Sequence, residues 1–381
     1  MADDIRQPAA VLHAVGTNPL RFWGMSAAER ARRIGRAAGL AWAGENAVFE
    51  GDGPWLLANS AFVFDAQWLR HIAAHPGMML TSAGVPVLAA CATIEQASRI
   101  AAAMRENRAA DPAGFETIAI EDAPTLENKA LRKRETPFVG RLDAASIPAL
   151  ERASYKGAYK GVTDLLTKYL WPEWAFVLTK IAARLGLTPN MVTGIGVILC
   201  IAATILFWQG HFWTGLALGL IFMVLDTVDG KLARCTITSS WWGNIFDHGV
   251  DLVHPPFWWF AWGMGLIPAG LALSPALFWG VMAVMFAGYV VQRLIEGAFI
   301  SLFGMHIHVW RKFDSDFRLV TARRNPNMLI LFVSLLFGRP DIGIVAVAAW
   351  TIVSLIVHLV QLGQAMAQKA RGRPPVSWLS A

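Results

Sequence analysis

Four aspartates at fixed spacing are the residues of this sequence best suited to chemistry. Asp226 and Asp229 are three residues apart and Asp247 and Asp251 are four apart, so each pair shares one helix face. Both pairs lie at the ends of apolar runs, where burying a charge is costly enough to need a reason. If the two helices form a hairpin, the four carboxylates converge on one pocket. Such a cluster remains ionised only beside cations, because like charges raise each other's pKa.

The residue types around this cluster indicate phosphate chemistry. Ligand sets made only of oxygen favour hard ions, which predicts two Mg²⁺ or Mn²⁺ ions that clamp a pyrophosphate and stabilise the oxygen leaving from it. Arg234 offers a planar donor fork for phosphate. Gly230, Ala233 and Gly243 lack bulk on faces that must approach each other or a nucleotide. The alternative of acidic helix caps is disfavoured, because a helix C-terminus prefers cations.

Together these residues form the pattern D-x2-D-G-x2-A-R-x8-G-x3-D-x3-D between Asp226 and Asp251. The pattern resembles the signature of the CDP-alcohol phosphotransferase family at all eight fixed positions. The segment from Thr188 to Thr193 also resembles the family motif that enters its first membrane span. The resemblance covers about residues 160 to 368.

This resemblance implies a six-helix membrane domain, usually a homodimer, with a polar cavity open to the cytosol. It implies a dimetal site on Asp226, Asp229, Asp247 and Asp251, with Asp251 also the general base for the acceptor hydroxyl. It further implies a reaction of a CDP-linked donor with an alcohol or lipid acceptor that releases CMP. The residues it assigns to the CDP pocket are Asn190, Thr193, Asp226, Asp229, Gly230, Ala233, Arg234 and Gly243.

Composition divides the chain into a soluble part and a membrane part. Of 381 residues 55% are hydrophobic and only 16% are charged, against about 25% charged in soluble domains. The sequence is mixed up to about residue 180, and long apolar runs begin at Met191. We expect six transmembrane helices, each near the roughly 20 residues that cross hydrocarbon: 191–209, 212–234, 243–267, 275–304, 326–345 and 346–367.

The charge pattern supports a membrane surface and argues against nucleic acid. The net charge of +6 comes largely from clusters beside apolar runs, such as Arg311 to Arg324 and Lys369 to Arg373, as expected from the positive-inside rule. The N-terminal part, the active site and the C-terminus are then cytosolic, in a multi-pass protein of a bacterial inner membrane. The first residues show no secretory signal, and the three cysteines show no disulfide or zinc spacing.

The soluble part is expected to be a small α/β domain with a partly parallel sheet. We predict buried strands at 54–58 and 61–64 and amphipathic helices at 27–38 and 94–105, with a charged linker over 122–145. An interfacial amphipathic helix is expected over 162–185, interrupted at Pro172. The predicted divisions are 1–140 for the soluble domain, 141–187 for linker and interfacial helix, 188–370 for the membrane domain and 371–381 for the tail.

The segment from Asn18 to Arg33 and the strand pair near 56–64 weakly resemble a cytidylyltransferase. The Gly-rich nucleotide loop with its following basic residue, expected after the first strand, is missing, and the stretch from Ala10 to Gly16 is a poor substitute for it. We therefore expect a degenerate, non-catalytic domain that serves as a scaffold or regulatory remnant.

Three further residues are candidates for contact with the acceptor. His254 lies one turn beyond Asp251, although a packing role is favoured for it as for His248. Arg293 and Glu296 lie three apart inside an apolar run, either as a structural ion pair or as acceptor ligands. The acceptor's identity, and whether donor or acceptor carries the lipid, stay open. The alternative function is a transporter or receptor-like protein that couples to ions through its carboxylates, but no repeated halves support it.

Overall fold

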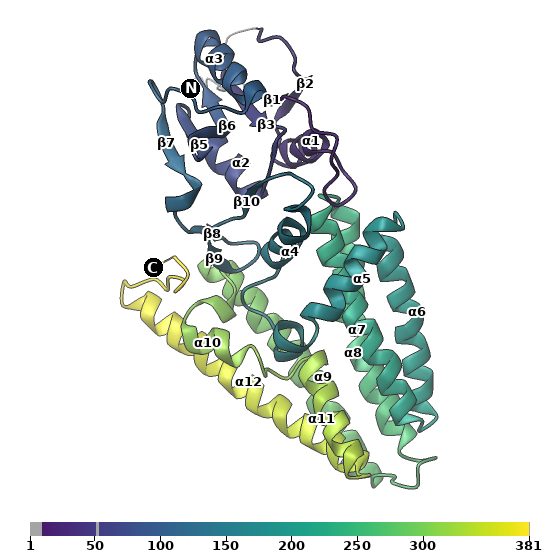
Figure 1. Cartoon of the computed structure of the whole chain (residues 1–381). Coiled ribbons are helices and arrows are strands. Elements are labelled where there is room, and N and C mark those ends of the chain that lie inside the picture. The colour runs from purple at the N-terminus through teal and green to yellow at the C-terminus, as the bar shows by residue number, and fades with distance from the viewer. Residues whose placement is uncertain (1–9, 51–52, 381) are drawn as a thin grey trace. The chain divides into compact units, whose positions relative to one another are not determined.

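The computed structural model describes residues 10–50 and 53–380, which form two compact units (Figure 1). The first unit comprises the chain up to Asn128 together with Arg134–Tyr159 and Lys231–Thr238. The second comprises Lys129–Lys133, Lys160–Gly230 and the chain from Ser239. The first nine residues, where no secretory signal was predicted, lie outside the described part.

A six-stranded mixed sheet forms the core of the first unit. Its order is β2-β1-β3-β6-β5-β7. Strand β1 pairs in parallel with β2 and β3, β5 pairs in parallel with β7, and β6 runs antiparallel to β3 and β5. This confirms the predicted α/β class. The strands are β1 (Val11–Val15), β2 (Ala41–Glu45), β3 (Trp55–Asn59), β5 (Met78–Ser82), β6 (Val85–Cys91) and β7 (Glu116–Ala119).

Three amphipathic helices of the first unit, α1 (Ala27–Ala37), α2 (Ala66–Ala73) and α3 (Ile94–Glu106), begin at polar caps. The side chains of Ser26, Asp65 and Thr93 accept hydrogen bonds from backbone N–H groups of the first turn, which satisfies donors that have no partner in the helix. Each helix buries its apolar face against the sheet. The predicted helices and strands of this part are therefore confirmed.

The charged segment predicted as a linker contains three short strands. Strand β8 (Leu126–Asn128) adjoins β9 (Lys133–Glu135). Strand β10 (Val139–Arg141) pairs antiparallel with β4 (Phe62–Phe64). The linker prediction was wrong because the apolar residues of β10 complete a ladder with β4. Helix α4 (Ile147–Gly157) follows, and the first unit continues to Tyr159.

The second unit is almost wholly helical. Its first four long helices agree with the predicted spans to within two residues at each end. The interfacial helix predicted over 162–185 forms two pieces, a π-helical turn and a helix that starts at Pro172. The elements are η2 (Leu166–Leu170), α5 (Pro172–Arg184), α6 (Pro189–Trp208), α7 (Phe212–Cys235), α8 (Trp241–Gly265), α9 (Pro275–Phe303), η3 (Ile307–Val309), α10 (Lys312–Phe317), α11 (Arg324–Leu336) and α12 (Pro340–Ala370).

Three of the described helices, α6, α9 and α12, are long and apolar enough to cross a membrane. Helices α7 and α8 are of spanning length, but the charged residues of the aspartate pattern interrupt their apolar runs. The prediction for residues 326–345 was wrong. Helix α11 has 13 residues, about 20 Å at 1.5 Å per residue, because Gly338 takes a positive φ and α12 begins at Pro340.

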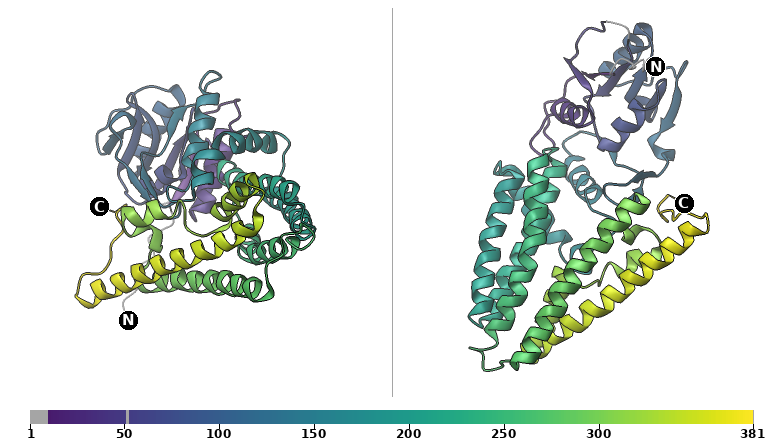
Figure 2. Two further views of the ribbon diagram at one scale, coloured as in Figure 1. Left: turned by 90° about the horizontal axis from the view of Figure 1, so that it is seen from below. Right: turned by 180° about the vertical axis from the view of Figure 1, so that it is seen from behind.

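Helix packing in the second unit brings α6 against α8, and α12 against α9 and α11 (Figure 2). The core of the unit includes Phe207, Trp258 and Trp262, all nearly fully buried. Trp258 Nε1 donates to the carbonyl of Cys200 at 3.2 Å. At the far end of the pair, a side chain on Gly265 would overlap the carbonyl oxygen of Phe207. The backbones of α6 and α8 therefore approach closely only because this residue is glycine.

Replacing Gly265 by alanine is predicted to lower the melting temperature of the detergent-purified protein. The added methyl group forces α6 and α8 apart, and overpacking of this kind costs about 1–3 kcal/mol. Gly280→Ala on α9 is the matched control, because no atom lies within 4 Å of its added methyl group. Equal melting temperatures for the two variants would show that the close approach does not hold these helices together.

Candidate functional site

The aspartates of the pattern meet where α7 and α8 run beside each other. One carboxylate oxygen from each of Asp226, Asp247 and Asp251 lies within 4.8 Å of the other two. The three-residue and four-residue spacings turn both pairs toward the facing helix. Three of the four predicted aspartates therefore form one cluster.

Asp229, the fourth aspartate, lies deeper than the cluster and is 3% exposed. Its Oδ2 accepts a 2.6 Å hydrogen bond from Thr193 Oγ1 on α6. Its Oδ1 is buried with no hydrogen-bond partner among the described residues. A buried carboxylate oxygen without a partner fits a cation, and an all-carboxylate ligand set favours a hard divalent one.

Arg324, at the start of α11, neutralises part of this charge. Its Nη2 donates to Asp226 Oδ2 at 2.7 Å and its Nη1 donates to Asp251 Oδ1 at 2.6 Å. The Arg324 side chain is only 13% exposed. Sequence analysis attributed this arginine to the membrane surface. In the sequence, Arg324 stands next to Arg323 and just before Asn325 and Asn327, and this run of polar residues could have indicated a buried polar role.

The residues predicted to contact CDP are divided between the two units, with Ala233 and Arg234 in the first and the others in the second. Asn190 and Gly243 lie together: a side chain on Gly243 would come within 2.9 Å of Asn190 Oδ1. Gly230 directly follows Asp229 on α7. Ala233 and Arg234 belong to the first unit, where Arg234 Nε donates to the carbonyl of Ala158 at 2.9 Å. For all these positions contact with a nucleotide stays a prediction.

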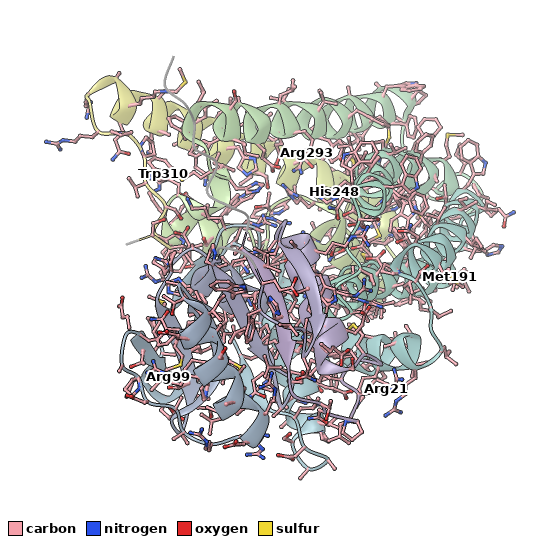
Figure 3. The ribbon with its side chains drawn as sticks, turned by 90° about the horizontal axis from the view of Figure 1, so that it is seen from above. Arg21, Arg99, Met191, His248, Arg293 and Trp310 are labelled. Atoms are coloured by element: carbon pink, nitrogen blue, oxygen red, sulfur yellow. The ribbon has the colours of Figure 1, made fainter. Side chains whose placement is uncertain are left out.

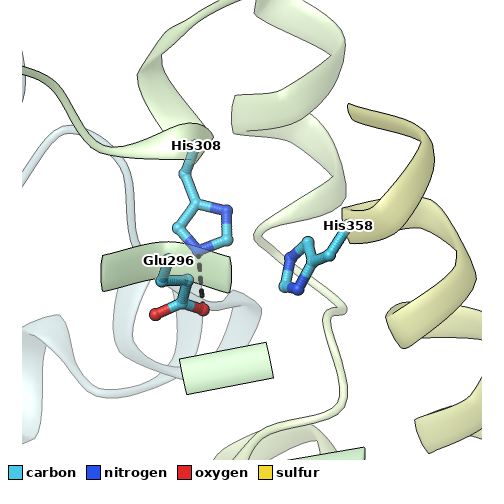
Figure 4. Close-up of side chains that lie close together, drawn as sticks. All are labelled: Glu296, His308 and His358. Atoms are coloured by element: carbon cyan, nitrogen blue, oxygen red, sulfur yellow. Dashed lines mark hydrogen bonds and ion pairs between the residues drawn. The ribbon is translucent and has the colours of Figure 1, made fainter. Parts of the chain in front are cut away.

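The acceptor candidates have different surroundings. His254 is 7% exposed, and its ring packs edge-on against Phe222 and Trp258 at 5.0 and 5.1 Å, which favours the packing role. His248 on the same helix is exposed (Figure 3). Arg293 Nη2 donates to Glu296 Oε1 at 2.8 Å, so these two form an ion pair on α9. The same oxygen also accepts from Arg323 and lies 3.3 Å from His308 Nε2 (Figure 4).

A second buried carboxylate is Asp164, before η2, which the sequence had placed at lipid headgroups or at the nucleotide pocket. It accepts from Thr167 N at 3.0 Å and from Asn325 Nδ2 at 2.9 Å. Burial raises its pKa, but the charge of Arg318 and these hydrogen bonds outweigh burial and leave the pKa below its ordinary value. Asp164 therefore stays ionised and anchors the turn after Arg324.

An apolar cavity of about 570 Å³ runs along α6 and α8. Ile201 and Ile205 line one side of it, and Trp242, Val253 and Phe257 line the other. Its apolar lining suits hydrocarbon chains. Val250 and His254, which also line it, lie on α8 within three residues of Asp251.

The sequence of this unit matches known proteins over the segment that holds the aspartates. Residues 186–313 match the family model described as CDP-alcohol phosphatidyltransferase. This segment includes the aspartate pattern and the helix that supplies Thr193.

The relatives that match this part of the chain have names that refer to different alcohols. Cholinephosphotransferase 1 of Gallus gallus is 35% identical over 30% of this chain and 36% of its own length. Choline/ethanolaminephosphotransferase 1 of Arabidopsis thaliana is 31% identical over 42% and 43%. Archaetidylinositol phosphate synthase of Pyrococcus horikoshii is 26% identical over 45% and 82%. The chain thus spans less than half the length of the cholinephosphotransferase relatives.

The solved structures that are similar to this chain include a phosphatidylinositol phosphate synthase of Mycobacterium tuberculosis with CDP-DAG bound. It shares 17% identity with this chain at a TM-score of 0.39, over 50% of this chain and 94% of that protein. The three helices that are long and apolar enough to cross a membrane support an integral membrane protein.

Replacing Thr193 by valine is predicted to weaken Mn²⁺ binding about 10- to 100-fold, the usual effect of removing a group that orients a ligand. The variant loses the hydroxyl that holds Asp229, while Thr193→Ser keeps it and should bind Mn²⁺ like the parent. Free Mn²⁺ measured by electron paramagnetic resonance during titration of the purified protein reports the affinity.

The matched control for this titration is Thr204→Val on the same helix, whose hydroxyl donates only to the carbonyl of Cys200. Equal Mn²⁺ affinity in Thr193→Val and the parent would contradict the role of the Thr193 hydroxyl. An equal loss in Thr204→Val would assign the effect to helix α6 as a whole.

Proposed function

We propose that the protein is an integral-membrane CDP-alcohol phosphotransferase. It transfers a phosphoalcohol or phosphatidyl group from a CDP-linked donor to an acceptor hydroxyl and releases CMP, in phospholipid or related lipid synthesis. The observation that supports this most is the cluster of Asp226, Asp247 and Asp251, with oxygens within 4.8 Å of one another, inside the matched segment. Asp229, with its unpartnered buried oxygen, completes a ligand set for two Mg²⁺ or Mn²⁺ ions.

The roles proposed for the residues follow from their surroundings. When bound, the metal ions would neutralise the charge that develops on the leaving phosphate oxygen. The side chain of Asp251 is 45% exposed, the most accessible of the clustered carboxylates, so an acceptor hydroxyl can reach it. Asp251 takes the hydroxyl proton as the hydroxyl oxygen bonds to the β-phosphorus. The bond from that phosphorus to the CMP oxygen breaks, and CMP leaves with the electron pair.

Arg324 has a positioning role in this proposal. Its guanidinium bridges Asp226 on α7 and Asp251 on α8, so it fixes the separation of the two helices at the site. The 2.6 Å bond from Arg324 Nη1 to Asp251 Oδ1 also restricts the rotation of this carboxylate. The proposed base is thereby held in one orientation before the acceptor arrives.

The proposal includes a multi-pass membrane protein, with the first unit, the site and the C-terminus in the cytosol, and a homodimer. Basic residues at 311–324 and 369–373 on one side of the apolar helices support this orientation. For the first unit we propose a nucleotidyltransferase-like scaffold without its own activity, because the stretch from Ala10 to Gly16 is a poor substitute for the Gly-rich nucleotide loop expected after the first strand.

The direct test is CMP release by the full chain in detergent with Mg²⁺. The donors are CDP-diacylglycerol with polar alcohols, and CDP-choline and CDP-ethanolamine with diacylglycerol. We expect CMP from one donor class, lost on chelation and lowered about 100-fold or more in Asp251→Asn, the scale expected for a general base. Asp316→Asn, at an exposed ion pair with Lys312, should keep the parent rate.

The outcome decides between clear alternatives. CMP release from one donor class identifies which substrate carries the lipid. No CMP from any donor, in protein that binds Mn²⁺ normally, would contradict the proposed activity. Full activity in Asp251→Asn would exclude Asp251 as the base while leaving the reaction in place.

A further inference from the structure

The last turn of helix α7 is part of the first unit. The helix carries Asp226 and Asp229 in the second unit, but its residues from Lys231 onward, with the turn up to Thr238, belong to the first. Cys235, the last helical residue, is fully buried there. The helix that supplies half of the proposed metal ligands is therefore held at its C-terminal end by the α/β unit.

Two arginines of α1 bind the carbonyl oxygens at this end of α7. Arg30 Nη1 donates to the carbonyl of Cys235 at 2.8 Å, and Arg33 Nη1 donates to that of Thr236 at 3.0 Å. The last carbonyl groups of a helix have no partner within it, and the negative end of the helix dipole favours cations. Both arginines thus satisfy exposed acceptors and place positive charge where α7 attracts it.

The side chain of Arg30 is fixed by its surroundings. The residue is 3% exposed, and its guanidinium carbon lies over the rings of Phe22 and Phe138, at 5.1 and 5.7 Å from their centres. Its Nη2 also donates to the carbonyl of Phe64 at 3.5 Å. A guanidinium packed on two aromatic rings and bonded to two carbonyls has little freedom to move. The end of α7 therefore meets a donor in a defined position.

Helix α4 binds the side of the same turn. The carbonyl oxygen of Ala158, which directly follows α4, accepts from Lys231 Nζ at 3.1 Å and from Arg234 Nε at 2.9 Å. Lys231 is 3% exposed, and its ammonium nitrogen lies 3.0 Å from the centre of the Tyr159 ring. The last turn of α7 is therefore attached at its end by α1 and along its side by α4.

The turn after α7 depends on the first unit as well. Thr238 N donates to the carbonyl of Ala233 at 2.8 Å and closes the helix, with Ile237 at a φ of 52°. A β-branched residue rarely takes this left-handed conformation, which usually falls to glycine. The side chain of Ile237 packs against the apolar cluster that includes Ile34 and Trp68. A strained turn persists only where its surroundings determine it, so contacts with this cluster define where α7 ends.

We propose that Arg30 and Arg33 are positioning residues for the carboxylates of α7, and that the first unit serves the reaction by holding this helix in place. Cys235 follows Asp229 by six residues, about 9 Å at 1.5 Å per residue. A hydrogen-bonded helix is rigid over this length, so its fixed end sets the carboxylates of α7 against those of α8. The catalytic use of the carboxylates rests on the proposed function, whereas the anchoring of α7 does not.

The first measurement is amide hydrogen exchange of the full chain in detergent, followed by mass spectrometry without substrate or metal. Arg30→Gln removes the donor to Cys235, and Arg33→Gln removes the donor to Thr236. We expect amides of residues 225–230 to exchange about fivefold faster or more in each variant, because release of its end lets the helix open more often. Arg36→Gln, at an exposed arginine of the same helix α1, is the matched control and should exchange like the parent.

The second measurement is Mn²⁺ affinity, followed by electron paramagnetic resonance. Arg30→Gln and Arg33→Gln should bind Mn²⁺ about tenfold more weakly than the parent, the scale expected when a group that orients ligands is lost. Arg30→Lys keeps a cation and one donor, so it should recover most of the affinity lost in Arg30→Gln. An arginine that only stabilises the first unit would lower the melting temperature and leave the Mn²⁺ affinity unchanged.

The outcomes separate the anchoring from the proposed function. Unchanged exchange at residues 225–230, or unchanged Mn²⁺ affinity in variants of a parent that binds Mn²⁺, would overturn the proposal. Faster exchange confined to residues 235–238 and to α1 counts as the first of these results. If Arg30→Gln does not fold, Arg33→Gln decides, because its side chain is 33% exposed. Absence of Mn²⁺ binding in the parent would contradict the proposed metal site, and exchange at residues 225–230 then decides the anchoring by itself.

Discussion

The repulsion among carboxylates held at the ends of apolar helices is the constraint on which the helical unit depends. Asp226, Asp247 and Asp251 place oxygens within 4.8 Å of one another, where unscreened like charges oppose folding. Two compensations are built from the chain: the Thr193 hydroxyl on Asp229 and the Arg324 guanidinium on Asp226 and Asp251. They come from α6 and α11, so the charge cluster dictates which helices must surround α7 and α8.

The packing of the helices also depends on the need to stabilise these carboxylates. Thr193 reaches Asp229 only if α6 lies tightly against its neighbours, and the glycine at 265 permits that approach at the other end of the α6–α8 pair. The charged ends of α7 and α8 also explain why these two helices, although 24 and 25 residues long, are less apolar than α6, α9 and α12. An apolar run long enough to cross a membrane and a cluster of charged side chains are therefore opposing demands on the same helix.

The sequence predicted what depends on local spacing and missed what depends on distant contacts. The aspartate pairs, four long helices and the principal strands of the sheet follow from periodicity and from the residue pattern. Arg324 contacts Asp251 across 73 positions of the chain, and a basic residue beside an apolar run looks the same whether it meets lipid headgroups or a buried carboxylate. The short α11 was missed because Gly338 and Pro340 had been placed inside one predicted crossing. Strand β10 was missed because its partner β4 lies far upstream.

The first turn of α11 explains how opposite charge clusters coexist in one unit. Arg323 contacts Glu296 on α9, Arg324 contacts the carboxylates of α7 and α8, and Asn325 donates to Asp164. Three consecutive residues thus contact four carboxylates, and the helix begins inside a polar network. Because Arg323 is paired with Glu296, it does not join Arg324 at the carboxylates of α7 and α8, and the two consecutive arginines serve separate polar clusters.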